Sequence, residues 1–163
     1  MIQSLLSLFQ NVPHELVVML LAAMPIVELG AAIPVGIAVF HLSPIVVYLF
    51  AIVGNLLPLL LVFFFLPKVL RLFAKHSPRL HALFDRYFFA LTTKHVSSFD
   101  RYGAIFLFIL VAVPNPGGGV WTASLLAILF RVHLKYAIPA IVGGILVSGL
   151  IVLSLTEASI NLF

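Results

Sequence analysis

The sequence predicts an all-α integral membrane protein with two re-entrant helical hairpins and two full transmembrane helices in an inverted repeat, plus amphipathic surface helices. Three observations predict it: an apolar composition, four long apolar stretches of which two are interrupted, and basic residues that gather in two segments. Of the 163 residues, 63% are hydrophobic and 9% are charged, and the mean hydropathy is +1.25. A water-soluble domain of this length cannot bury so much apolar surface, so we expect one membrane domain over residues 1–163.

The composition also excludes several functional classes. The chain has no cysteine, which excludes disulfides, thiolate zinc sites and a cysteine nucleophile. No serine, histidine and acidic residue lie together at membrane depth, so we expect no enzyme activity, no catalytic residues, no metal site and no cofactor. The net charge of +4 is read as a membrane-topology signal, and nucleic acid is not an expected partner.

The first elements are an interfacial helix and a broken apolar stretch. Residues 1–15 carry apolar side chains at helical spacing, which predicts a helix lying in the membrane interface. Residues 16–40 are long enough to cross a bilayer, but polar or helix-breaking residues interrupt them at Pro25, Glu28, Gly30 and Pro34. We therefore predict that this stretch enters and leaves on the same side.

The second and fourth apolar stretches, residues 44–66 and 136–155, are nearly continuous and predict transmembrane helices. Asn55 lies near the centre of the first, where its amide needs a partner, either a packed neighbouring element or a substrate. In the last helix, Gly144 and Ser148 belong to a small-residue face that is typical of a packing or dimer surface. We expect a homodimer.

The third apolar stretch, residues 104–130, contains two prolines and three glycines between Pro114 and Gly119. No continuous helix survives such a run, so we predict a second re-entrant hairpin. The half-helix that begins at Val120 then points its free amides toward the midplane, where they suit an anionic group. The alternative is a purely structural turn.

The basic residues support this arrangement. Seven of the nine Lys and Arg residues lie between Pro67 and Gly103, and Arg131 and Lys135 follow the third stretch. If residues 104–130 are re-entrant, all nine lie on one side, as the positive-inside rule requires. Residues 67–103 then form a basic, amphipathic cytoplasmic segment near anionic lipid headgroups, and residues 131–135 are also cytoplasmic. The alternative role of this segment is topology alone. We expect a prokaryotic inner membrane.

Glu28 is the one charged residue inside the four apolar stretches. A charge at membrane depth is costly, so such residues usually face a cavity and serve function. Burial favours the neutral form of a carboxyl group, which suits a group that takes up and releases protons. The alternative is a helix N-cap near water.

Several motifs together resemble a known family. They are Pro25-Ile-Val-Glu28-Leu-Gly-Ala-Ala-Ile-Pro34, Gly54-Asn55, Arg101-Tyr-Gly103 and Pro114-Asn-Pro-Gly-Gly-Gly-Val-Trp-Thr122. This order resembles the putative small multidrug export protein family, a distant relative of the DedA (SNARE-associated, VTT) superfamily. The resemblance implies two re-entrant elements and a role in proton-dependent tolerance of cationic compounds or in lipid movement. The family's usual arginine after Glu28-Leu29 is missing here, which favours a cationic over a phosphate-bearing substrate.

We therefore predict a small proton-linked transporter that moves a hydrophobic cation or a lipid through a midplane site. The alternative is a membrane scaffold or assembly factor that transports nothing. The predicted substrate- or proton-binding residues are Glu28, Asn55, Arg101, Asn115, Gly117, Gly118, Gly119, Trp121 and Thr122, and the predicted structural breaks are Pro25, Gly30, Pro34, Pro114 and Pro116.

Overall fold

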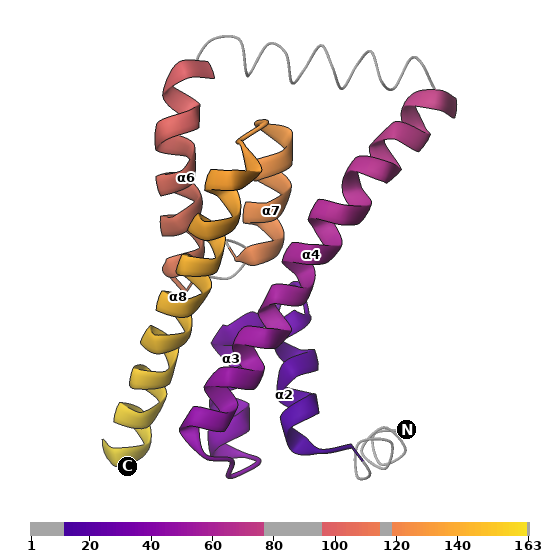
Figure 1. Ribbon diagram of the computed structural model, residues 1–163. Coiled ribbons are helices and arrows are strands. Elements are labelled where there is room, and N and C mark those ends of the chain that lie inside the picture. The colour runs from indigo at the N-terminus through magenta and orange to yellow at the C-terminus, as the bar shows by residue number, and fades with distance from the viewer. Residues whose placement is uncertain (1–11, 77–95, 115–118, 163) are drawn as a thin grey trace.

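The computed structural model describes residues 12–76, 96–114 and 119–162, and within these ranges every regular element is a helix. The elements are α2 (His14–Ala23), α3 (Glu28–Ala38), α4 (Pro44–His76), α6 (Val96–Ala112), α7 (Val120–Leu129) and α8 (Leu134–Leu162). The predicted interfacial helix lies mostly outside the described residues, since the description begins at Val12. Among the helices described, α4 and α8 are much the longest, and each follows a pair of shorter helices (Figure 1).

The first apolar stretch is interrupted once rather than several times. Helix α2 ends at Ala23, α3 begins at Glu28, and Pro25 lies in the turn between them. The prediction that Gly30 and Pro34 break the chain is wrong, because both lie inside α3. Proline removes one amide donor and crowds the carbonyl four residues before it. Here that residue is Gly30, whose carbonyl loses the amide of residue 34 as a partner, yet α3 continues to Ala38.

The third stretch is interrupted where its prolines and glycines lie. Helix α6 ends at Ala112, Pro114 follows it, and α7 begins at Val120. Residues 115–118 lie outside the described residues. Helix α6 begins at Val96, several residues before the apolar stretch itself, so the first half of this hairpin is longer than the sequence predicts.

The two continuous stretches form α4 and α8. Residues Pro44–Val69 of α4 and Leu134–Ile160 of α8 are long and apolar enough to cross a membrane. Helix α4 continues past Pro67 to His76, so the start of the basic segment extends the helix instead of forming a separate one. Residues 77–95 of the predicted basic segment lie outside the described residues.

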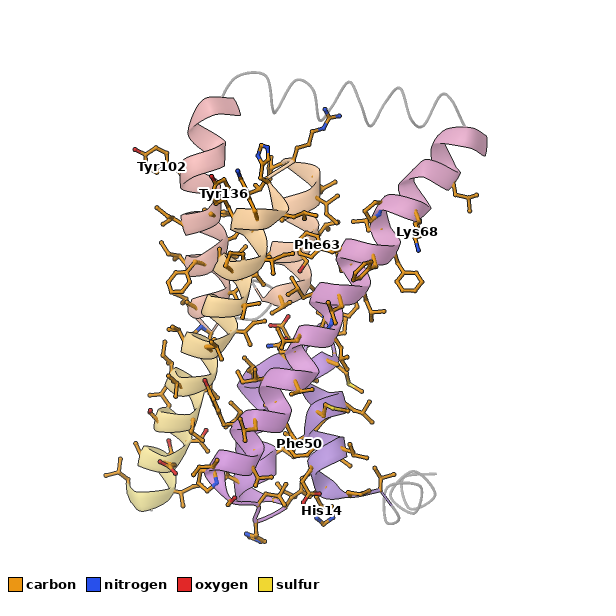
Figure 2. All side chains as sticks on the ribbon, in the orientation of Figure 1. His14, Phe50, Phe63, Lys68, Tyr102 and Tyr136 are labelled. Carbon is orange, nitrogen blue, oxygen red and sulfur yellow. The ribbon has the colours of Figure 1, made fainter. Side chains whose placement is uncertain are left out.

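The two long helices run in opposite directions, and the two hairpins lie toward opposite ends of the molecule (Figure 1). Helix α2 packs mainly on α4, and α6 packs mainly on α8. Each hairpin also reaches across, because α3 packs on α8 and α7 packs on α4. Helices α3 and α7 both begin near mid-height (Figure 1). The end where α4 leaves and α8 begins carries Lys68, Arg131 and Lys135 and is called the basic end below (Figure 2).

Glycines allow the closest helix contacts. A Cβ on Gly54 of α4 would collide with the carbonyl of Met19 in α2. A Cβ on Gly144 of α8 would lie 2.9 Å from the carbonyl oxygen of Phe108 in α6. The sequence left open whether the Gly144 face serves packing or dimerisation, and the structure uses it for packing within the chain.

The exterior of the long helices is apolar. Phe64 and Phe65 of α4 are 63% and 60% exposed, and Leu150 and Leu155 of α8 are 52% and 62% exposed. Such a surface is costly in water and suited to lipid. Tyr102, Tyr136 and Lys68 lie toward the basic end, whereas His14 lies at the opposite end (Figure 2).

Candidate functional site

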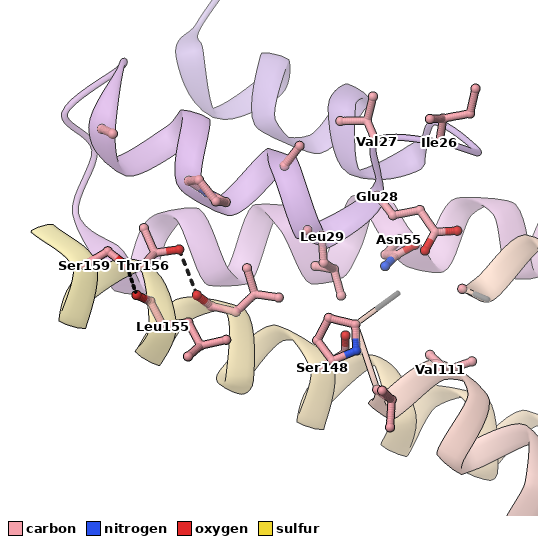
Figure 3. A pocket seen from close by; sticks show the side chains of 18 of the residues that line it. Ile26, Val27, Glu28, Leu29, Asn55, Val111, Ser148, Leu155, Thr156 and Ser159 are labelled. Atoms are coloured by element: carbon pink, nitrogen blue, oxygen red, sulfur yellow. Dashed lines mark hydrogen bonds between the residues drawn. The ribbon is translucent and has the colours of Figure 1, made fainter. Parts of the chain in front are cut away.

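A cavity of about 680 Å³ lies between the first hairpin and α8. Its wall comes from the turn before α3, one face of α3, Asn55 of α4, the last residues of α6, Gly119 and a face of α8 (Figure 3). Most lining side chains are apolar, and Glu28 is the one charged residue among them. The lining residues that the structure describes include no lysine, arginine or histidine.

Glu28 lies at the first residue of α3 with a backbone φ of 43°. This left-handed conformation is uncommon for a residue with a side chain and costs on the order of 1–3 kcal/mol. The surrounding structure holds it, since the Glu28 amide donates to the carbonyl of Met24 across 3.2 Å. Strain of this kind gathers at functional sites, and here it aims the carboxyl group toward the second hairpin.

The Glu28 carboxylate lies at the N-terminus of α7. It accepts a hydrogen bond from the backbone amide of Trp121, and a Cβ built on Gly119 would overlap its oxygens. Gly119 is the N-cap residue of α7 and has no side chain with which to cap the helix. Glu28 therefore supplies, from the other hairpin, the negative charge that a helix N-terminus binds. The anionic group that the sequence predicts at this helix end is, in this conformation, the protein's own carboxylate.

Trp121 makes a second link between the hairpins. Its indole Nε1–H donates to the carbonyl oxygen of Ala23 across 3.0 Å. Ala23 is the last residue of α2, where carbonyl groups lack helical partners. The start of α7 is thus tied both to the end of α2 and to the start of α3.

Two buried polar side chains have unsatisfied oxygens. Asn55 lines the cavity beside Glu28 and is 1% exposed, and its Oδ1 has no hydrogen-bond partner among the described residues (Figure 3). Ser124 of α7 is 0% exposed, and its Oγ is also unpartnered in the part of the chain described. A buried polar atom without a partner costs about 1–3 kcal/mol of folding free energy. Such atoms therefore usually bind a ligand or water, or find a partner in a second conformation.

The α8 wall of the cavity carries hydroxyl groups that sequence reasoning missed. Thr156 donates to the carbonyl of Val152 across 2.8 Å, and Ser159 donates to that of Leu155 across 2.8 Å (Figure 3). Their protons are used within α8, whereas their oxygen lone pairs remain available. Ser148 lines the same wall. The signal in the sequence was hydroxyl residues recurring on one face of an apolar helix.

The structure brings some predicted site residues together and not others. Glu28, Asn55 and Gly119 line the cavity, and Trp121 contacts Glu28 through its backbone. Thr122 is half-buried on α7 and does not line it. The predicted residues Asn115, Pro116, Gly117 and Gly118 lie outside the described residues.

The backbone of Arg101 lies far from the cavity. It lies on α6, eleven residues before that helix ends at Ala112, which is roughly 16 Å along the axis. Its side chain lies outside the described part of the structure.

Comparison with known proteins places the chain in a family. No curated protein and no solved structure matches the chain. One family model matches residues 28–151, so the match begins at Glu28 and covers α4, the second break and α8 as far as Ile151. Together with the two long apolar helices, this family match indicates a membrane protein of the exporter type. The chain belongs to the family described as "Putative small multi-drug export protein".

Proposed function

We propose that the protein is a small proton-linked transporter that moves a hydrophobic cation through the cavity at Glu28. The observation that carries the proposal is the Glu28 carboxylate, which lines an apolar cavity and bridges the starts of α3 and α7. A carboxyl group there alternates between two states: ionised, it binds the amides of α7, and protonated, it loses that attraction. Proton uptake at Glu28 would therefore loosen the contact between the hairpins.

The proposal includes an inverted repeat, and three matched pairs of residues support it. His41 and Arg131 both have left-handed backbones, with φ of 52° and 53°, just before the long helices. Pro44 and Leu134 begin α4 and α8. Gly54 and Gly144 make the close contacts of the long helices with α2 and α6. In every pair the second residue follows the first by 90 positions. The same order of elements supports the further proposal of kinship with the DedA superfamily.

The proposal also includes re-entrant hairpins. Helices α2, α3 and α7 have 10, 11 and 10 residues, or roughly 15 Å each, which is half of a ~30 Å hydrocarbon core. With the basic end facing the cytoplasm, residues 67–103 and 131–135 meet anionic headgroups and the chain obeys the positive-inside rule. A prokaryotic inner membrane and a homodimer belong to the same proposal.

The cavity chemistry favours a cation over a phosphate-bearing lipid. A phosphate would need a basic partner or free helix amides, and the described lining offers no basic side chain. The α7 amide of Trp121 already binds Glu28. A cation with an apolar body would instead find one carboxylate, hydroxyl oxygens and apolar walls.

Glu28→Gln tests the proposal. In vesicles with an imposed pH gradient, we expect this variant to move the fluorescent cation ethidium at least about tenfold more slowly than wild type, equivalent to ~1.4 kcal/mol. Glu15→Gln is the matched control, because Glu15 lies in the first turn of α2 and not in the cavity. A fluorescent phospholipid analogue in the same vesicles separates cation movement from lipid movement.

The second candidate is a scaffold without transport, and the Trp121–Ala23 hydrogen bond favours it because it fixes the two hairpins together. A scaffold predicts that folded Glu28→Gln keeps wild-type behaviour, or that the variant fails to fold. Normal abundance with lost ethidium movement supports the transporter, and unchanged ethidium movement overturns it.

A further inference from the structure

The cavity leads from Glu28 toward one end of the molecule. Its lining runs along α3 from Pro34 to Ala38 and along α8 to Ser159 and Ile160, near the ends of both helices. This is the end opposite the basic end (Figure 1). In this conformation α3 and α8 therefore flank a route between Glu28 and the non-basic side.

Between Glu28 and the basic end, the equivalent contact between α7 and α4 is closed. Helix α7 packs mainly on α4 and also on α8 and α6, and Val120, Ala123, Ser124 and Ala127 of α7 are each 0% exposed. Tight packing of this kind explains the apolar members of the set but not Ser124.

Ser124 differs from the other hydroxyl residues whose bonds are known. Ser154, Thr156 and Ser159 of α8 each donate to the carbonyl four residues before them, at 2.8 Å. Ser124 is also helical and has the same option, yet its Oγ has no partner within the described residues. In this conformation the Ser124 hydroxyl therefore does not bond to the carbonyl four residues before it, and it is buried without a partner in the part of the chain described.

The 90-residue spacing assigns Ser124 a counterpart. Ser124 corresponds to Pro34, which lines the open cavity, and Ile128 corresponds to Ala38 at the cavity's outer part. On the long helices, the cavity-lining Ser148 corresponds to Pro58 of α4, which is fully buried. The closed α4–α7 contact thus occupies, in the second half of the chain, the place that the open cavity occupies in the first.

We infer that the protein has a second conformation, in which α7 separates from α4 and Ser124 lines a route from Glu28 to the basic end while α3 closes onto α8. The inference rests on the proposed inverted repeat and names the second access route of the proposed transporter. Exchange of conformations between inverted halves supplies alternating access to one central site. It also gives the unpartnered Ser124 hydroxyl a function, since it meets water or the passing cation in the second state.

Single-cysteine labelling tests this, because the chain has no cysteine of its own. Ser124→Cys and Ile128→Cys report the inferred route, and Ala38→Cys reports the open cavity. Lys135→Cys and Ser43→Cys are exposed controls for the basic and the opposite ends. A membrane-impermeant maleimide is added to sealed vesicles of each orientation.

We expect the Ser124→Cys and Ile128→Cys variants to react from the basic side and Ala38→Cys from the opposite side. If the second conformation holds about 0.1–10% of the molecules, Ser124→Cys reacts about 10- to 1000-fold more slowly than Lys135→Cys. Tetraphenylphosphonium, used as a cation probe, should change the labelling rates of Ser124→Cys and Ala38→Cys in opposite directions by shifting the two populations.

Two results overturn the inference. One is labelling of the Ser124→Cys variant from the non-basic side, and the other is no labelling of Ser124→Cys and Ile128→Cys from either side while Ala38→Cys reacts. The Ile128→Cys variant guards against a local effect of the Ser124 substitution. The two proposals can fail separately. If Ser124→Cys and Ala38→Cys react from opposite sides as expected while Glu28→Gln leaves ethidium movement unchanged, the proposed function fails and the second conformation stands.

Discussion

The breaks that follow α2 and α6 both interrupt an apolar stretch, but they contribute different chemical groups to the site. The first break is short, contains one proline and presents Glu28 on a left-handed backbone. The second runs from Val113 to Gly119 and ends in a glycine that leaves the N-terminus of α7 uncapped by its own side chain. Each break supplies what the other lacks, a negative charge on one side and free amides on the other. The site therefore belongs to neither hairpin alone.

The largest expected effect comes from Gly119→Ala, which breaks this complementarity by filling the space that the Glu28 carboxylate occupies. The added Cβ must displace the carboxylate, and we expect the free energy of unfolding to fall by about 1–3 kcal/mol. Thermal unfolding in detergent measures it. Gly30→Ala is the matched control, since a Cβ there meets nothing within 4 Å and alanine favours a helix by about 1 kcal/mol.

A double-mutant cycle identifies the cause. If the carboxylate is what the new Cβ strikes, Glu28→Gly should relieve most of the cost of Gly119→Ala, because it removes the carboxylate and also tolerates the left-handed backbone. Additive losses in the double variant would show that Glu28 and Gly119 do not meet, and the comparison between the breaks would fail.

The next effect is smaller and concerns the neutral link between the hairpins. Trp121→Phe removes the hydrogen bond to the Ala23 carbonyl and should lower the free energy of unfolding by about 1 kcal/mol beyond the loss of ring volume. Tyr48→Phe is the comparison variant, since the Tyr48 hydroxyl donates to the Leu146 carbonyl at 3.1 Å in an exposed position. We expect chemical unfolding to show a smaller loss for Tyr48→Phe, and equal losses would remove any special role for the Trp121 bond.

These expectations also separate what the sequence could reveal from what it could not. The positions of both breaks could be predicted, because Pro25 and the Pro114–Gly119 run act locally on the backbone. Gly30 and Pro34 led to a wrong prediction, because α3 continues through both residues although local rules treat them as helix breakers. The contact between Glu28 and the start of α7 is tertiary and joins residues about ninety positions apart, so no local pattern indicates it.

The hydroxyl wall of α8 was missed for a different reason. In an apolar helix with many small residues, Ser148 and Thr156 look like packing residues, and only the neighbouring α3 shows that they face a cavity. Ser124 was missed because a single serine in α7 has no distinguishing spacing. Its burial without a partner in the described structure is a property of the fold rather than of the sequence.

The smallest change in stability is expected at Ser124, where a substitution separates folding from function. Ser124→Ala removes a buried hydroxyl that has no partner among the described residues, so the free energy of unfolding should stay within about 0.5 kcal/mol or rise. Thr156→Val is the matched variant, since it removes a hydroxyl whose proton is bonded to the Val152 carbonyl. If Ser124 lines the second route, Ser124→Ala should slow ethidium movement while thermal unfolding is unchanged. A large loss of stability would instead show that the hydroxyl is satisfied in the folded protein, and the unpartnered Ser124 would no longer support a second route.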